Sequence, residues 1–450
     1  MKRSLTLTAV LLAICGTIFA QDPMQFFSEN PDRVANNMHS YEFHEIYDSP
    51  VPKGFKPFYI SHYGRHGSRY ELNHTFAKDA QAAFHQLDSL GLLTATGEKL
   101  YSEVNEIVDA HVGMEGSLTT VGAQEHRKLA ERMARRYPSV FKDRNRPEVD
   151  CFSSTNFRCI MSMCNFTYRL KEIYPKEQFT FSSAQKYMSY INPSLNIRRP
   201  SDPAPQRPSF PAGMRFPNPN APQPKYTPAT GTPGYDFTRF LTPLFTDMDA
   251  ALKVLGNPEP FVKGIFNAGG LCQLFDTDIE ILRSRFTTEE LVYLWAGGND
   301  SIYRMWAGSE ENGETIRYAI IPLLKDFIEK ADAAIAPGSR RAADLRFGHD
   351  TSILPLFALL GIDDPLSRTF PYKKAHEMGW FAGLQIPMAT NCQMIFYRNK
   401  KGEVLTKVLY NEKEVLIPGV EPLFGPYYEW NTLKGHFLGL CDKATAQWLK

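Results

Sequence analysis

The sequence lacks several features that mark common classes of protein. It contains no CxxC pair, which argues against a zinc cluster, and no long basic run. Together with a formal net charge of only +1, the absence of a basic run argues against nucleic acid as a partner. Beyond residue 19, no apolar run approaches the roughly 20 residues that a membrane-spanning helix needs. No internal repeat is evident.

The composition is that of an ordinary globular protein, with 43% hydrophobic and 22% charged residues in a chain of 450. The N-terminus has the pattern of an export signal: Lys2 and Arg3 precede an apolar run over residues 5–19, and Ala20 offers a cleavage point. We therefore predict a signal peptide over residues 1–20 and an exported mature chain, periplasmic or secreted. Cys15 follows bulky Ile14 in this leader, which disfavours lipid attachment.

The mature chain keeps an even set of cysteines. In an oxidising compartment they permit up to three disulfides, with the pairing left open. They are Cys151, Cys159, Cys164, Cys272, Cys392 and Cys441.

A proline-rich segment over residues 200–234 holds 11 of the 32 prolines and predicts a long loop or linker. Before it, residues 118–137 have a helical pattern, with Leu129, Ala130, Met133, Ala134 and Tyr137 on one face and Arg and Glu elsewhere. After it, residues 238–255, 286–297 and 312–335 also favour helix, so the middle of the chain is predicted to be helix-rich.

Short apolar runs at residues 57–61, 149–154 and 343–348 each end in polar or glycine residues and suit buried strands. Residues 392–410 indicate a hairpin with Gly402 in its turn. Strands separated by helices predict an α/β fold in which a central mixed sheet is flanked by helices on both faces. We expect one domain over residues 21–450, with an α/β core of about 50–160 and 340–450 and a helix-rich insertion of about 160–335.

Ligands of such sheets bind outside the carboxyl ends of the strands, so the residues after the three runs should converge. The first run is followed by Arg65, His66, Gly67 and Arg69 and the second, in the region after it, by Arg158. His349 and Asp350 follow the third. These residues together predict a phosphate site.

The chemistry suits phosphoryl transfer. Arginine's planar, permanently charged fork matches phosphoryl oxygens, and neighbouring cations keep a histidine neutral and therefore nucleophilic. Attack by His66 would form a phosphohistidine, and a protonated Asp350 could supply the proton that the leaving group needs. Gly67 removes a side chain where the backbone must bend and a ligand could come close.

The motifs RHGSR at 65–69 and HDTS at 349–352, with residues 118–138 and 152–162, resemble the histidine acid phosphatases, the branch of the histidine phosphatase superfamily that includes phytases. The similarity runs from about residue 58 to the hairpin. It implies a phosphoglycerate-mutase-like sheet with a mainly helical region covering the site, and no cofactor or metal. It also implies roles for six residues: His66 as nucleophile, Asp350 as proton donor, and Arg65, Arg69, Arg158 and His349 as phosphate-binding groups.

Two positions depart from the family pattern RHGxRxP and its second motif. Glu71 occupies the proline position, and Ser352 stands where many members have asparagine. Inositol polyphosphate phosphatases of this branch usually have HAE, so the His349-Asp350 pair favours acid phosphatases and phytases. Tyr70, which such phosphatases share, keeps the other possibility open.

Other interpretations remain. A phosphate- or phosphosugar-binding protein without turnover would use the same arginines, whereas a phosphoglycerate mutase is disfavoured by the leader. Asp350 could also cap the helix that follows it. His62 and His66 do not share a helical face, since Gly64 and Gly67 interrupt, so a zinc pair is disfavoured and His62 is predicted to be structural. The sequence predicts a small phosphomonoester as ligand and leaves the oligomeric state open.

Overall fold

The structure is a computed structural model that describes residues 22–195, 197 and 226–450. The predicted signal peptide lies outside the described residues, as does most of the proline-rich segment.

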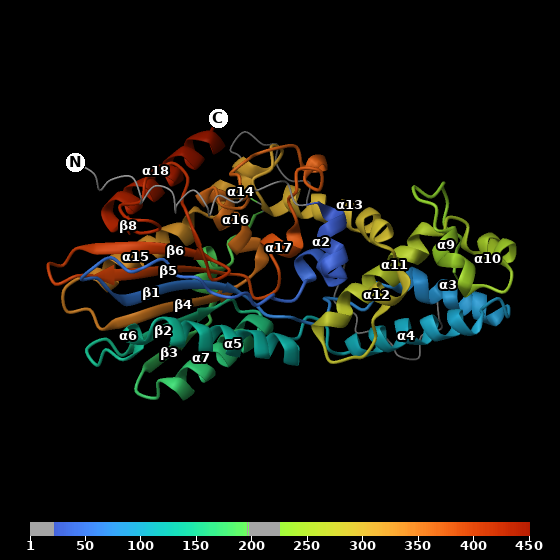
Figure 1. Ribbon diagram of the computed structural model, residues 1–450, viewed down its shortest axis with the longest axis horizontal. Coiled ribbons are helices and arrows are strands. Elements are labelled where there is room, and N and C mark those ends of the chain that lie inside the picture. The colour runs from blue at the N-terminus through green and yellow to red at the C-terminus, as the bar shows by residue number, and fades with distance from the viewer. Residues whose placement is uncertain (1–21, 196, 198–225) are drawn as a thin grey trace, which may run out of the picture.

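The centre of the molecule is a mixed sheet of strand order β3-β2-β4-β1-β5-β6-β7, with β8 pairing β6 (Figure 1). β3, β2, β4 and β1 run parallel, whereas β5, β6 and β7 add antiparallel neighbours. The strands are β1 (Lys56–Arg65), β2 (Glu148–Ser153), β3 (Gln178–Ser182), β4 (Arg341–Gly348), β5 (Asn391–Arg398), β6 (Val404–Tyr410), β7 (Lys413–Val415) and β8 (Tyr428–Glu429). The predicted fold class, a mixed sheet flanked by helices, is confirmed.

Helices cover both faces of the sheet. α15 (Ile321–Ile335), α16 (Asp350–Leu360) and α18 (Trp430–Trp448) share one apolar core with Tyr59, Tyr63 and Phe396. α5 (Thr120–Arg136), α6 (Pro138–Phe141) and α7 (Phe157–Ile173) share another with Ile60 and Phe347 on the opposite face (Figure 1). Alternate side chains of β1 therefore enter different cores, as expected of a central strand.

A group of helices lies beside the sheet around a third apolar core (Figure 1). These are α3 (Lys78–Ser89), α4 (Ala95–His111), α9 (Thr238–Leu241), α10 (Met248–Leu255), α11 (Glu259–Leu271), α12 (Ile281–Arg285) and α13 (Thr288–Trp306). The predicted insertion covers about residues 160–335, but α3 and α4 precede it in the chain. This third core therefore contains residues from inside and from outside the predicted insertion. The division into an α/β core and an insertion stays a prediction.

Residues 22–44, which we call the N-terminal arm, contain α2 (Pro23–Glu29) and the 3-10 segment η1 (Pro31–Met38). In Figure 1 the arm lies between the sheet and the lateral helices, and it contacts α11, α13 and the short helix α17 (Ala382–Gln385). The remaining short elements are η2 (Gln185–Tyr187), α8 (Met188–Ile191), η3 (Thr242–Leu244), η4 (Cys272–Leu274), α14 (Gly313–Ala319) and η5 (Tyr372–Lys374).

Most of the predicted elements form, with differences at prolines. The three strands and the hairpin are present, and Gly402 has a φ of +84° in the hairpin turn. The stretch 238–255 is broken after Leu241, where Pro243 introduces a 3-10 turn, and 312–335 is split before Pro322. Both breaks follow from the missing proline N–H and its restricted φ.

The six cysteines of the described chain are all free, so the three permitted disulfides are not formed. Burial raises the pKa of the Cys392 thiol to about 12. It raises the pKa of Cys159 to about 12 as well.

Candidate active site

The ends of β1 and β4 bring the two motifs together. The strands pair in parallel with Arg65 opposite Gly348, and the backbone N–H of His66 donates to the Gly348 carbonyl at 2.9 Å. The imidazole rings of His66 and His349 consequently lie with their centroids 5.7 Å apart. Two motifs far apart in the sequence thus meet at the carboxyl edge of one sheet, as the strand rule predicts.

Gly67 allows the loop after β1 to lie against the start of α5. A Cβ on Gly67 would come within 2.5 Å of the Gly122 carbonyl oxygen, and a Cβ on Gly122 within 2.1 Å of the Ser68 carbonyl oxygen. The φ of Gly67 is not positive. Close packing on a helix is therefore a requirement for glycine at this position that the sequence did not indicate.

His66 is held as a neutral imidazole with a defined tautomer. Its Nδ1 lies 2.9 Å from the Gly67 carbonyl, which can only accept, so Nδ1 carries the proton and Nε2 has a free lone pair. Burial and the neighbouring guanidinium groups of Arg65, Arg158 and Arg69 lower the pKa of His66 well below its ordinary value. The ring has the form that a nucleophile needs.

Arg65 and Asp350 form a buried ion pair, with Nη2 and Oδ2 2.8 Å apart. Arg65 Nη1 also donates to the carbonyls of Asn37 and Ile386 at 2.5 and 2.8 Å. Burial lowers the pKa of Arg65 to about 10, against the opposing effect of Asp350, so the guanidinium stays charged at neutral and acidic pH.

Asp350 begins α16, and His349 occupies the N-cap position. The carboxylate therefore does not have the capping role that the sequence left open. Burial alone would raise its pKa, but Arg65, a hydrogen bond from Asn37 Nδ2 at 3.0 Å and His349 outweigh it, and the pKa of Asp350 is lowered.

His349 is oriented by two neighbours. Its Nδ1 lies 3.4 Å from Arg158 Nη2, which can only donate, and its Nε2 lies 2.9 Å from the Ser154 hydroxyl. The proton therefore sits on Nε2 and is donated to Ser154. Burial, followed by Arg158, lowers the pKa of His349 to about 4.

The two remaining arginines differ in their surroundings. Arg69 Nη1 pairs with Glu71 Oε2 at 2.7 Å and donates to the Tyr70 carbonyl at 3.0 Å. Arg158, in the first turn of α7, donates to Asn156 Oδ1 at 2.9 Å, and burial lowers its pKa. Glu71, the residue that departs from the family pattern, thus neutralises one of the predicted phosphate-binding groups.

All six predicted site residues converge at this edge, together with three groups that the sequence did not single out. Glu125 is one: its carboxylate accepts from the backbone N–H and hydroxyl of Ser68, at 2.7 and 2.8 Å, and from Tyr41 N at 2.9 Å. Burial raises its pKa. Glu125 lies on the buried face of α5, whereas the glutamates of this helix were expected to lie off its apolar face. Its i, i+4 spacing to Leu129 could have indicated the buried position.

The other two are Asn37, described above, and Ser154. Neither carries a sequence signal, since asparagine and serine are ordinary loop residues. Ser352, the other departure from the family motif, is buried in the first turn of α16.

His62 packs beneath the site with His126. Both rings are buried against Phe166 and Phe347, and burial lowers both pKa values to about 3. Neutral packed rings fit the predicted structural role of His62.

Among residues 22–195, 197 and 226–450, no three His, Cys, Asp or Glu side chains are grouped as metal ligands. Within the same ranges, no helix is both long and apolar enough to cross a membrane.

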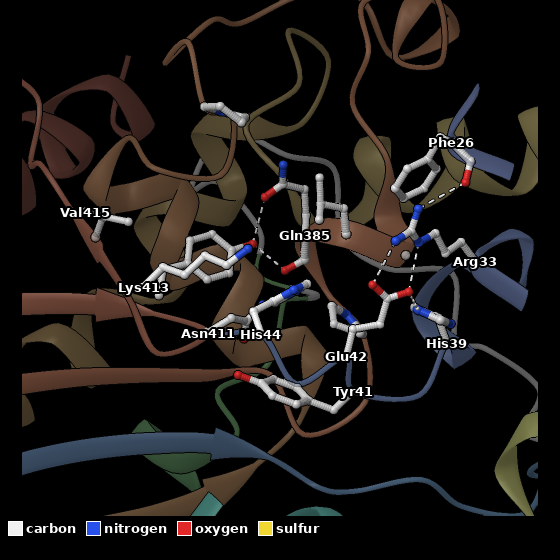
Figure 2. A pocket seen from close by; sticks show the side chains of 15 residues that line it. Phe26, Arg33, His39, Tyr41, Glu42, His44, Gln385, Asn411, Lys413 and Val415 are labelled. Carbon is white, nitrogen blue, oxygen red and sulfur yellow. Dashed lines mark hydrogen bonds and ion pairs between the residues drawn. The ribbon is translucent and has the colours of Figure 1, made fainter. Parts of the chain in front are cut away.

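A cavity of about 190 Å³ lies between the N-terminal arm and the segment around α17 and β7 (Figure 2). Its lining includes Glu42 and His44 of the arm and Gln385, Tyr410 and Lys413 opposite. The six predicted site residues are not part of this lining, so the cavity is separate from the predicted phosphate-binding groups.

Comparison with known proteins supports the resemblance that the motifs indicated. No family model matches the sequence. The chain is 23% identical over 337 residues to multiple inositol polyphosphate phosphatase 1 of Homo sapiens, a match that covers 67% of this chain. It spans 62% of that relative's length, less than two thirds.

Two solved structures share the fold. The multiple inositol polyphosphate phosphatase of Bifidobacterium longum in complex with phosphate gives a TM-score of 0.69 at 17% identity, covering 91% of this chain and 98% of that one. The phytase from D. castellii gives a TM-score of 0.63 at 15% identity, covering 92% and 86%. The predicted resemblance to the histidine acid phosphatase and phytase family is confirmed.

Proposed function

We propose that the chain is a phosphoric monoester hydrolase that acts on inositol phosphates through a phosphohistidine on His66. The observation that carries the proposal is the meeting of His66, Asp350 and the arginines at one sheet edge, in a chain whose relatives are inositol polyphosphate phosphatases and phytases.

In the first step, His66 Nε2 attacks phosphorus and a P–N bond replaces the ester P–O bond. The leaving oxygen takes the proton of Asp350 and departs as the alcohol. In the second step, water attacks phosphorus and returns a proton to Asp350, while the P–N bond breaks and inorganic phosphate leaves. General acid–base help of this kind contributes ~10²–10⁴-fold.

Arg65, Arg69 and Arg158 would hold the phosphoryl oxygens, and His349 would do so once its Nε2–H turns from the Ser154 hydroxyl to the phosphoryl group. Two of these arginines already pair with carboxylates, Arg65 with Asp350 and Arg69 with Glu71. An entering phosphoryl group competes for both guanidinium groups. Because Arg65 lowers the pKa of Asp350, sharing its charge with phosphate raises that pKa and favours the protonated form that the first step requires.

Inositol phosphates are the substrate class that the relatives favour. The His349-Asp350 motif favoured acid phosphatases and phytases, yet a polyphosphate phosphatase of the same superfamily accounts for the relatives at least as well. Hydrolysis of phosphate monoesters in general is the broader form of the proposal. Export through the predicted signal peptide belongs to it as well.

The test is phosphate release from myo-inositol hexakisphosphate and from an aryl phosphate between pH ~4 and 7, where carboxylates and histidines titrate. We expect His66→Ala to lower turnover by at least ~10³-fold, since residues that act as a unit fail together. His85→Ala, which removes an exposed histidine of α3, is the matched control and should behave like the parent chain.

A retained turnover in His66→Ala, or abolition of parental activity by EDTA, would contradict the mechanism. Phosphate binding without release from any monoester would favour the binding-protein interpretation instead.

A further inference from the structure

The N-terminal arm carries none of the family motifs, yet it is firmly packed. Phe26 stacks on Phe381 with centroids 4.8 Å apart, and Phe27 meets Trp295 edge to face at 4.8 Å. The backbone N–H of Met388 donates to an arm carbonyl, that of His39, at 2.7 Å. The arm is thus held between the lateral helices and the segment that precedes β5.

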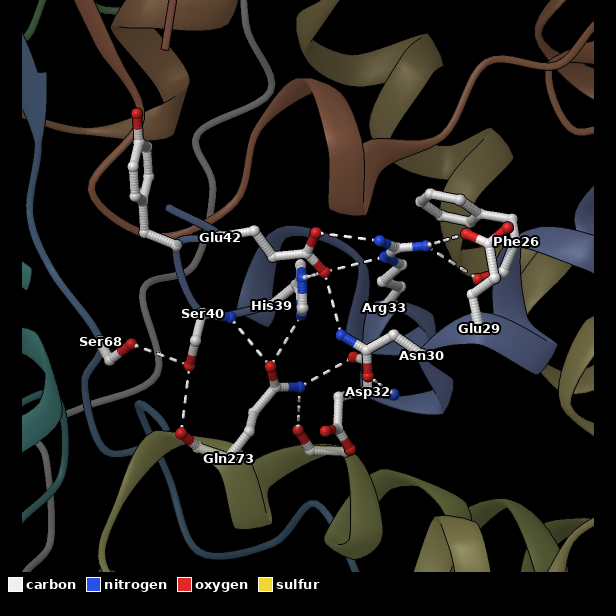
Figure 3. A network of polar contacts seen from close by, with 12 residues as sticks. Phe26, Glu29, Asn30, Asp32, Arg33, His39, Ser40, Glu42, Ser68 and Gln273 are labelled. Carbon is white, nitrogen blue, oxygen red and sulfur yellow. Dashed lines mark hydrogen bonds and ion pairs between the residues drawn. The ribbon is translucent and has the colours of Figure 1, made fainter. Parts of the chain in front are cut away.

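A polar network ties the arm to the lateral helices and to the loop after β1 (Figure 3). Arg33 binds Glu42 through two nitrogens at 2.8 and 3.0 Å, and His39 bridges Glu42 and the Gln273 side chain at 2.9 and 2.7 Å. Burial would raise the pKa of Glu42, but hydrogen bonds from His39 and Arg33 lower it well below its usual range.

The same network reaches the RHGSR motif. Ser40 N donates to Gln273 Oε1 at 2.9 Å, and the hydroxyls of Ser40 and Ser68 lie 3.3 Å apart. The position of the arm is therefore set by groups on both sides of the candidate site.

Asn37 is the residue of the arm that reaches Asp350. Its neighbour Asn36 has φ 55° and ψ −126°, a conformation that few side chains adopt, and this kink separates Asn37 from the preceding turn. The Asn37 carbonyl accepts from Arg65 Nη1, and its amide donates to Asp350 Oδ2. Asn37 thus contacts both members of the buried ion pair.

We propose that Asn37 is a positioning residue that sets the orientation and the protonation of Asp350. This role rests on the proposed function, in which Asp350 gives and receives a proton. As a carboxylate, Asp350 accepts from Thr351 N on Oδ1 at 2.9 Å and from Asn37 Nδ2 on Oδ2 at 3.0 Å, and Oδ2 also forms the ion pair with Arg65 Nη2. Asn37 therefore stabilises the charged form that must take up the proton from water.

An asparagine suits this position because its amide has both a donor and an acceptor. When Asp350 is protonated, a half-turn of the Asn37 amide presents its oxygen to the new O–H. Neither alanine nor a second carboxylate can serve both states, since alanine has no polar group and a carboxylate only accepts when ionised.

The other groups that face Asp350 come from several elements. They are Arg65 and Tyr63 of β1, Arg69 of the following loop, Arg158 and Cys159 of α7 and His349 at the start of α16. All of them remain in Asn37 variants, so a change in pH dependence between these variants and the parent reports on the Asn37 contact.

The experiment compares the parent, Asn37→Ala and Asn37→Asp by the pH dependence of kcat. A general acid acts when protonated, so activity falls on the basic side of the profile as Asp350 loses its proton. Removing a donor to the carboxylate raises its pKa, so we expect the basic limb of Asn37→Ala to move up by about 1 pH unit. Asn37→Asp places a like charge there and should move the limb further.

Gln25→Ala, in an exposed part of the arm, is the matched control and should keep the parental limb. A merely structural role of Asn37 would lower kcat and Tm at every pH and leave the limb in place, which would overturn the inference.

Calorimetric binding of inorganic phosphate over the same pH range separates this inference from the proposed function. Phosphate binds less well next to a charged Asp350, so its affinity should fall as the pH rises. The pH at which the affinity falls should be lowest in the parent, higher in Asn37→Ala and highest in Asn37→Asp. If no chain turns over substrate but the phosphate affinities keep this order, only the proposed function is contradicted. Parental turnover with unshifted limbs in both variants contradicts only the role of Asn37.

Discussion

Two segments of the chain meet at Asp350, and they differ in how their roles are encoded. Residues 59–69 approach it as a buried strand and a loop whose side chains form a compact motif. The N-terminal arm contributes Asn37, whose side-chain amide donates to Asp350 and whose backbone carbonyl accepts from Arg65. The first segment supplies the charged side chains of the site, and the second supplies hydrogen bonds that hold Asp350 and Arg65 in place.

Residues of a compact motif can be identified from the sequence, whereas a segment that acts through single hydrogen bonds cannot. A loop that must present arginine and histidine to one phosphoryl group needs those residue types at close spacing. A segment that supplies hydrogen bonds to such a group needs only the right backbone path, which many sequences can follow. Three substitutions probe this contrast, and the largest effect is expected where the two segments are joined.

Glu125→Gln acts on both segments at once. Its carboxylate accepts from Ser68 and from Tyr41 N, so an amide NH₂ would face a donor on one side. We expect the free energy of unfolding to fall by about 2 kcal/mol and kcat/KM to fall by about 10-fold, from thermal melts and phosphate release. Glu131→Gln on the same helix is the control, and equal losses in both would show that Glu125 has no special role.

Arg33→Ala acts on the arm alone. The guanidinium binds Glu42 twice and is largely buried, so its loss should lower the free energy of unfolding by about 1–2 kcal/mol. Proteases should also cleave the N-terminal arm faster. Because the arginines of the sheet edge are untouched, phosphate affinity should change less than twofold by calorimetry. Arg135→Ala, which removes a 78% exposed side chain, provides the comparison. An unchanged melting temperature and cleavage rate would mean that the arm is held by its aromatic side chains.

Glu71→Gln acts on the loop alone and should have the smallest effect. Glu71→Gln frees Arg69 from a partly buried ion pair, so KM for inositol hexakisphosphate should fall about 2–5-fold, which corresponds to about 0.5–1 kcal/mol. An aryl phosphate, with a single phosphoryl group, should respond less. Glu115→Gln removes the same charge from the neighbouring loop, where Glu115 pairs with His74. If Glu115→Gln lowers KM as much as Glu71→Gln does, the effect comes from the total charge near the site and not from the Arg69–Glu71 ion pair.

Much of the sheet and of the site could be predicted because the signals are local. The apolar runs at β1, β2 and β4 end where the functional residues begin, and parallel strands bring such ends together. The ion pairs were not predictable. Whether Arg69 meets Glu71, or Arg65 meets Asp350, depends on rotamers and loop paths that a one-dimensional pattern does not contain.

The features that sequence reasoning did not indicate have equally specific causes. The packing of Gly67 on Gly122 of α5 could not be predicted because the two glycines are 55 positions apart and no local pattern connects them. The proline breaks near 243 and 322 were passed over because the apolar periodicity continues across them. Asn37 was missed because it acts through a contact with a residue more than 300 positions away.

The strand order has a consequence for how the protein reaches this state. β1 lies between β4 and β5, so its two partners are made only in the last quarter of the chain. A nascent chain therefore carries an apolar strand with both edges open until residues 341–398 have emerged, and long-range parallel pairing is slow. His66 and Asp350 meet only when that pairing is complete, so the proposed nucleophile and its proposed proton donor are apart in a partly folded chain.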